Sequence, residues 1–147
     1  MKSFDEFLKK GVIRKQSQEI PRARNLVFEA ERRKRNLNEL IRKIGLKEDN
    51  SNEIIEDCYS ILMCLIRAKM SFEGYKSFGY SAHEAEVSFM QKIGFIEKDI
   101  EFTDQLRRFR NQINYEGKKF DKEYARKVIE FIKKNYLKLK NPLNNIL

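Results

Sequence analysis

The chain has 147 residues, with 31 Lys and Arg against 22 Asp and Glu, and its formal net charge is +9. This length predicts a single domain over residues 1–147, with a short tail after about residue 140, whose core needs no disulfide or structural metal. The longest apolar run covers residues 61–66, far below the roughly 20 residues of a membrane span. Because no basic-then-apolar leader opens the chain, we expect a soluble, cytoplasmic protein without membrane contact.

The charge is unevenly distributed along the chain. Residues 1–46 carry 13 Lys and Arg against 6 Asp and Glu, residues 47–104 carry 6 against 12, and residues 105–147 carry 12 against 4. Three arrangements are compatible with this pattern: a basic face that attracts phosphates, internal neutralisation, or a dimer formed by charge complementarity. Four consecutive basic residues crowd one helical turn at residues 32–35.

The sequence lacks the residues that several kinds of catalytic or metal site require. Cys58 and Cys64 are six positions apart on one predicted helix, so they face different directions and neither bridge nor share a metal. The chain has no Gly-rich phosphate loop, no His-Glu-x-x-His and no Cys/His cluster, which excludes a P-loop ATPase and a zinc enzyme. We therefore expect no metal and no cofactor. His83 is the only histidine, so acid–base chemistry by histidine must use His83.

The positions of Gly and Pro in the first half of the chain indicate helices. Only six Gly and two Pro occur, and no alternating run or hairpin signal favours a sheet. We predict a short helix over residues 4–10 that ends at Gly11, then a polar connection over residues 11–19. A long second helix begins around Pro21 and stops at Gly45.

The third helix is predicted to open at Asn50 with Glu53 in a capping box, and to be the most apolar helix of the chain. Residues 72–80 form an aromatic loop. Ser81 and Glu84 repeat the capping signature and start a fourth helix that runs to Gly94.

A fifth helical region covers residues 96–115, with an interruption at residues 102–104 where Thr103 caps the second part. Asp121 is predicted to cap the last helix, which Pro142 ends. The fold class that follows is all-α: an antiparallel up-and-down bundle of four to five main helices plus a short N-terminal helix.

The best candidate site lies in residues 107–117. Ile100, Thr103, Leu106 and Ile113 place Arg110 on an apolar stripe, so its guanidinium requires acceptors near the core. One interpretation is a structural ion pair at a homodimer seam. The other is a groove that binds RNA or a nucleotide, with arginines on phosphates and tyrosine on a base; its residues are Arg107, Arg108, Arg110, Asn111 and Tyr115. His83 is either a helix-start residue or an accessory member of this site.

Two segments resemble the HEPN superfamily. They are residues 79–85, which open a helix after an aromatic loop, and residues 106–111 followed by Tyr115. The likeness extends over residues 18–136. It implies a helical bundle that dimerises, in which an Arg, the adjacent polar residue and a His separated from the Arg by four to six residues cut RNA without metal. Arg110 and Asn111 match the first two positions, and residues 115–117 contain no histidine.

The resemblance implies a catalytically degenerate RNA- or nucleotide-binding protein, because Tyr115, whose unperturbed pKa is about 10, replaces the histidine. It also implies a prokaryotic toxin–antitoxin pair, with a minimal nucleotidyltransferase as partner and Tyr115 as a possible nucleotide acceptor. The alternatives are an active metal-independent endoribonuclease, with Arg110, Asn111 and Tyr115 as catalytic residues, and a purely structural homodimeric module.

Overall fold

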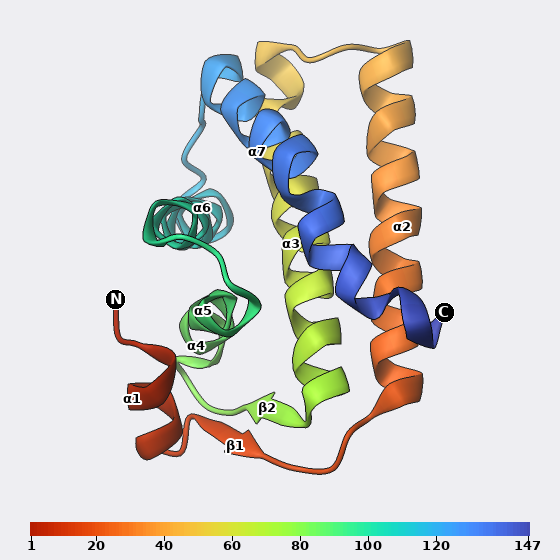
Figure 1. Cartoon of the computed structure of the whole chain (residues 1–147). Helices are drawn as coiled ribbons and strands as arrows, with labels where there is room; N and C mark the ends of the chain where they lie inside the picture. Colours follow the sequence, from red (N-terminus) through yellow and green to blue (C-terminus); the bar gives the residue numbers. More distant parts are fainter.

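The computed structural model describes residues 1–147 and confirms the predicted all-α helical bundle (Figure 1). Only one small sheet of two strands accompanies the helices. The elements in chain order are α1 (Phe4–Lys9), β1 (Ile13–Lys15), α2 (Ile20–Lys43), the 3-10 helix η1 (Glu48–Asn50), α3 (Ser51–Glu73), β2 (Tyr75–Ser77), α4 (Ala82–Ser88), α5 (Met90–Ile93), α6 (Glu97–Glu116), α7 (Lys122–Lys140) and the 3-10 helix η2 (Asn141–Ile146).

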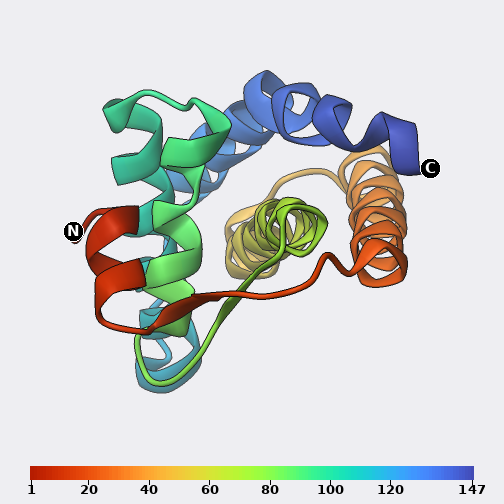
Figure 2. The same cartoon turned by 60° about the horizontal axis from the view of Figure 1, so that its bottom comes forward.

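Helix α3 occupies the centre of the bundle, and Figure 2 shows the other helices arranged around it. Every residue from Ile61 to Ile66 is at most 7% exposed. A helix that is apolar on all sides is stable only when neighbours cover its whole circumference. The composition of α3 therefore explains why α2, α4, α6 and α7 all contact it.

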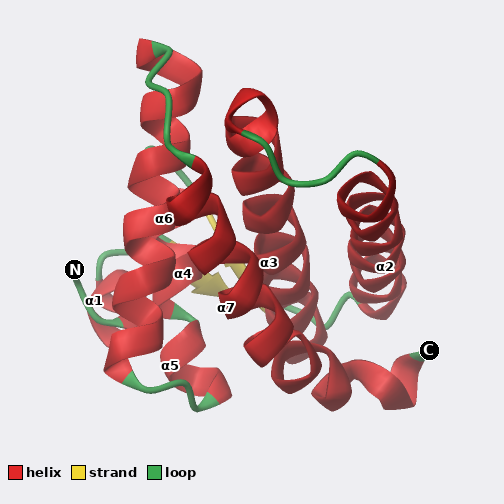
Figure 3. Cartoon of the chain, turned by 90° about the horizontal axis from the view of Figure 1, so that it is seen from above, coloured by secondary structure: helices red, strands yellow, loops and turns green.

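The helices are not all parallel to the central one. Helices α2 and α3 run antiparallel, whereas α6 is seen end-on in Figure 1 and along its length in Figure 3. Helix α7 crosses α3, and Phe102 of α6 stacks on Phe131 of α7 with 4.4 Å between ring centroids. Helix α6 also crosses α3, so that the last turns of α6 lie beside the middle of α3 and the start of α4.

The small sheet contradicts the loops expected at residues 11–19 and 72–80. Strands β1 and β2 pair antiparallel in the register Ile13↔Ser77 and Lys15↔Tyr75. Gly74 makes this pairing possible: it ends α3 with φ +81°, and a Cβ there would clash with the carbonyl oxygen of Gln16. Three-residue strands are too short to show alternation in a sequence, so the pattern gave no warning.

The predicted helix caps are partly wrong. Neither Asn50 nor Ser81 makes a side-chain cap hydrogen bond. Asn50 instead closes the preceding turn, because its oxygen accepts from the Lys47 amide (2.8 Å) and its nitrogen donates to the Gly45 carbonyl (2.9 Å). Asp121 is confirmed as the cap of α7, since its Oδ1 accepts from the Tyr124 amide at 2.8 Å.

Helix α6 is continuous, so the predicted interruption at residues 102–104 is wrong. Thr103 is fully buried, and its hydroxyl donates to the Asp99 carbonyl one turn earlier (3.0 Å). A threonine that satisfies its hydroxyl in this way is tolerated inside a helix. The tail after residue 140 also differs from the expectation, because it forms η2 and buries Leu143.

No helix combines the length and apolarity that a membrane crossing requires. Cys58 and Cys64 are both buried and unpaired, as their spacing predicted.

Candidate functional site

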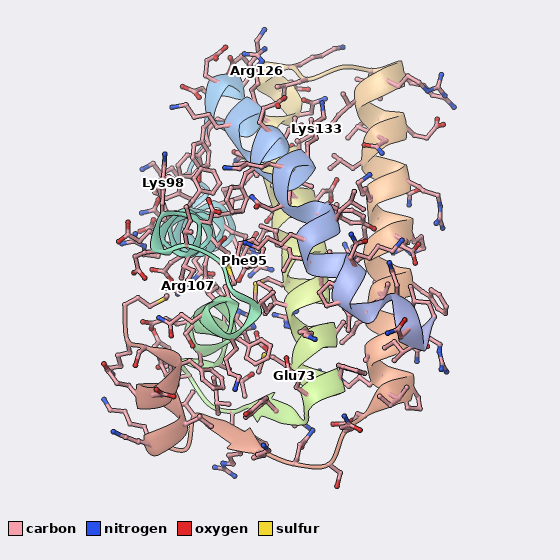
Figure 4. The ribbon with its side chains drawn as sticks, viewed as in Figure 1. Glu73, Phe95, Lys98, Arg107, Arg126 and Lys133 are labelled. Atoms are coloured by element: carbon pink, nitrogen blue, oxygen red, sulfur yellow. The ribbon has the colours of Figure 1, made fainter.

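A pocket of about 420 Å³ lies between α6 and the segment that leads into α4. We call this cavity the α6 pocket. Four of its lining residues come from the last turns of α6 and the rest from residues 79–84; the side chains that define its chemistry are Tyr80, His83, Arg107, Arg110, Asn111 and Tyr115. In Figure 4, Arg107 lies on the side of α6 that faces α4. The pocket thus joins His83 to residues that the sequence placed on a different helix.

Arg110 is half-buried and has no carboxylate partner, because none of the ion pairs of the protein includes it. Its guanidinium carbon lies 5.7 Å from the centroid of the Tyr59 ring. With the Asn114 amide turned so that its oxygen faces Arg110, that oxygen accepts from Nε at 3.0 Å and its nitrogen donates to Glu56. Glu56 therefore reaches Arg110 only through Asn114, and the guanidinium keeps donors for a ligand.

The other two predicted arginines, Arg107 and Arg108, differ in exposure and in whether they line the pocket. Arg107 is 16% exposed in its side chain, and its Nε donates to Oδ1 of Asp104 at 2.8 Å. Arg108 is 61% exposed and 3.7 Å from the same carboxylate. Arg107 lines the α6 pocket and Arg108 does not.

Two tyrosine rings stand at the rim of the α6 pocket. Tyr115 is 83% exposed and Tyr80 is 107% exposed. Asn111 lies between the arginine side and the tyrosine side of the α6 surface, and its amide makes no hydrogen bond within the protein. Sequence reasoning missed Tyr80 because residues 72–80 were expected to form a packed loop, in which an aromatic ring is normally covered.

His83 lies in the first turn of α4 and is exposed overall. Partial burial against the pocket wall lowers the pKa of the imidazole below its ordinary value, and the charges of Arg67, Arg110 and Arg107 lower it further, whereas Glu86 opposes them. A neutral imidazole both donates and accepts hydrogen bonds. His83 lies at the start of α4 as predicted, and its position in the α6 pocket is the feature that the structure adds.

A second cavity of about 210 Å³ adjoins the first, and His83 and Arg110 line both. We call it the α3 pocket, because most of its wall belongs to α3. Its lining also includes Arg33 of α2 and Tyr59, Ser60 and Arg67 of α3. Of the four basic residues at 32–35, only Arg33 reaches this site. Neither Tyr59 nor Arg67 was predicted as a site residue, because the sequence does not show which side of α3 faces α6.

A buried carboxylate fixes the wall that carries His83. Glu86 is 7% exposed and accepts from Arg67 Nε (3.1 Å) and from the Ser77 hydroxyl (2.9 Å). These bonds tie α4 to α3 and to β2. A buried carboxylate requires such partners, and this network fixes α4 against α3 and β2.

The fold and the site together define an all-α helical bundle with an arginine- and tyrosine-lined pocket between α6 and the start of α4. No three His, Cys, Asp or Glu side chains gather in a way that suits a metal ion. Comparisons of the chain with protein-family models, with curated proteins and with solved structures find no match.

Proposed function

We propose that the protein is a HEPN-like domain that binds RNA in the α6 pocket without being an efficient nuclease. The observation that carries this proposal is Arg110, a guanidinium without a carboxylate partner that lines the pocket beside an unbonded Asn111 amide. A structural arginine in a helical bundle is normally paired with an acid. Arg110 instead directs unused donors into a cavity, which suits a ligand that carries negative charge.

The remaining lining residues suit single-stranded RNA. Arg107 and Arg110 provide two guanidinium groups for backbone phosphates. Tyr80 and Tyr115 are exposed rings at the rim, and stacking of a base on such a ring contributes about 1–3 kcal/mol. Asn111 offers both a donor and an acceptor to a base edge. Sequence-specific recognition of RNA uses this combination on unpaired bases.

The test is fluorescence anisotropy with a labelled single-stranded RNA, using Arg110→Ala and the matched control Arg108→Ala. Both substitutions remove one positive charge from α6, but only Arg110 lines the pocket. We expect Arg110→Ala to weaken binding about tenfold or more, and Arg108→Ala to have a small effect. For two phosphate contacts, the logarithm of the affinity should fall with the logarithm of salt with a slope of about −1.4.

A structural role for Arg110 predicts a different pair of results. If Arg110→Ala unfolds the domain, or if both variants bind RNA as the unmodified protein does, the RNA proposal fails and a purely structural interaction module explains the arginine. Thermal unfolding of both variants, followed by circular dichroism, separates loss of fold from loss of binding.

A second candidate function is metal-independent RNA cleavage, and the presence of His83 in the α6 pocket favours it. His83 comes from α4, so it supplies an imidazole beside Arg110 and Asn111 although position 115 is a tyrosine. An imidazole with a pKa below its ordinary value is neutral at pH 7 and can accept the proton of a ribose hydroxyl. Incubation with RNA in chelator tests this function: cleavage that His83→Gln and Arg110→Ala both abolish would establish it.

The HEPN-like proposal includes two partners. One is a second copy of the chain, which light scattering after gel filtration detects as twice the monomer mass. The other is a nucleotidyltransferase, for which the exposed Tyr115 hydroxyl is an accessible acceptor. Mass spectrometry of the protein after co-expression with such an enzyme tests this, because Tyr115→Phe would remove a nucleotide adduct on that residue.

A further inference from the structure

We infer that the α3 pocket is a second anion site, which takes the terminal phosphate group of the RNA strand or nucleotide held in the α6 pocket. The inference rests on the proposed function, because the ligand reaches the α3 pocket from the α6 pocket. The two cavities adjoin at Arg110 and His83, which line both. A single ligand can therefore occupy them together.

The charges of the α3 pocket favour an anion. Arg33, Arg67 and Arg110 bring guanidinium groups from three different helices to its wall, and no carboxylate lines it. The two acids that pair with its arginines lie outside the lining. Glu29 is shared between Arg33 and Arg32, and Glu86 is bound to Arg67. Three lining cations thus face a cavity whose own surface offers them no counter-charge.

Tyr59 provides independent support for a ligand. Its side chain lines the α3 pocket and is only 4% exposed, and its hydroxyl is buried without a hydrogen-bond partner. Burial raises the pKa of this hydroxyl, and the charges that act on it are those of Arg67, Glu86, Arg110 and Arg107. An unused buried donor is rare, because leaving one unsatisfied destabilises a fold.

A terminal phosphate fits this site better than a phosphate within a strand. A phosphate monoester carries about −1.5 to −2 charges at pH 7, whereas a backbone diester carries one. The monoester also has three free oxygens, which match a set of donors that surrounds the cavity. The α3 pocket, at about 210 Å³, has half the volume of the α6 pocket. This difference assigns the smaller cavity to the phosphate and the larger to the nucleoside.

The first experiment uses His83 as a reporter. It is the only histidine, so its Hε1 proton gives one histidine signal whose pH titration is read directly by NMR. The groups that face it are Glu86 on α4, Arg67 on α3 and Arg107 and Arg110 on α6, with Arg33 across the same pocket. Inorganic phosphate in the pocket should shift the titration of His83 to higher pH than chloride does at equal ionic strength. Identical titrations in the two salts would overturn the anion site.

Two tyrosine variants make this measurement specific. Tyr59→Phe should weaken the phosphate effect on His83 about tenfold, because it removes one charge-assisted hydrogen bond. Tyr124→Phe is the matched control: its hydroxyl is also buried and unpartnered, but Tyr124 packs against Phe109 and Phe120, and it lines neither pocket. Equal effects of the two variants would contradict the role of Tyr59.

The second experiment compares RNA oligonucleotides of one sequence that carry a 5′-phosphate, a 3′-phosphate or no terminal phosphate. One phosphorylated form should bind about tenfold more tightly than the bare strand. Arg33→Gln should remove this advantage, and Arg35→Gln, an exposed neighbour on α2 outside both pockets, should preserve it.

The two proposals fail in different ways. RNA binding that depends on Arg110 but gains nothing from a terminal phosphate or from Arg33 would overturn the phosphate site and leave the proposed function intact. No RNA binding, together with a phosphate-dependent shift of His83, would overturn the proposed function and support an anion site that serves a free nucleotide.

Discussion

Replacement of Tyr59 by phenylalanine should stabilise the protein in the absence of ligand. Tyr59 is 4% exposed in the centre of the bundle, and its hydroxyl oxygen is buried without a hydrogen-bond partner. The substitution keeps the ring, including its contact with the Arg110 guanidinium at 5.7 Å, and removes only the unsatisfied group. A change of this kind isolates the free energy of one polar atom.

The expected gain is about 1 kcal/mol in the free energy of unfolding. A buried polar group without a partner destabilises the folded state by about 1–3 kcal/mol, and the lower end applies because the ring lines a pocket that opens towards solvent. For a chain of this size the gain corresponds to a rise in Tm of roughly 2–4 °C. Urea unfolding followed by circular dichroism measures it, since chains below about 150 residues usually unfold in one step.

A loss of about 1 kcal/mol or more in Tyr59→Phe would refute this reasoning, because it would mean that the hydroxyl is hydrogen-bonded in solution. Glu86 is the carboxylate whose charge contributes to the raised pKa of that hydroxyl. Tyr124→Phe controls for the general effect of deleting a buried hydroxyl, and we expect it to be stabilising as well. Combined with weaker phosphate binding, a more stable Tyr59→Phe variant would show that the hydroxyl is retained for a ligand at the expense of the fold.

Two further predictions concern the frame of the site. Gly74→Ala should destabilise the protein by more than about 2 kcal/mol, because Gly74 has φ +81° and its Cβ would clash with Gln16; Gly45→Ala, at φ +89° in open space, should lose only about 1 kcal/mol, and thermal unfolding compares them. The pKa of His83 is lowered in the folded state, so the unfolded chain binds its proton first as the pH falls below about 6.5. Stability should therefore decline from pH 7 towards pH 5, and His83→Gln should decline less; an equal decline would contradict the assignment.

The helices were predictable because local signals set their ends. Pro21 and Gly45 bracket α2 within about a residue or two, a usual margin for helix boundaries, and Asp121 caps α7 as its sequence indicated. The β1–β2 sheet was not predictable, because its two strands are short and only the packing of α1 and α3 brings them together. Thr103 was misread because a threonine satisfies its hydroxyl inside a helix as readily as at a cap.

Several residues of the site were predictable one by one, but their arrangement in space was not. Arg110, Asn111 and Tyr115 follow from a polar group on an apolar stripe, and His83 from its being the only histidine. Their meeting depends on the crossing of α6 over α3, which no local pattern encodes. Arg33, Tyr59 and Arg67 were missed for the same reason, since each needs the rotation of α2 or α3 about its own axis to be known. The one available signal was the position of Arg67, directly after the apolar run of residues 61–66.

The distribution of charge points to the same part of the molecule. Nine of the eleven ion pairs join residues three or four apart on one helix, and the other two are Arg67–Glu86 and Lys140–Glu31. The acidic middle of the chain therefore does not neutralise the basic ends through direct pairs, and exposed local pairs contribute little stability. Arg33 from the first basic segment and Arg110 from the last converge instead on Arg67 of the acidic segment. Glu29 and Glu86 already pair with Arg33 and Arg67, so Arg110 is the guanidinium of this pocket that has no carboxylate partner, and a bound anion would supply its counter-charge.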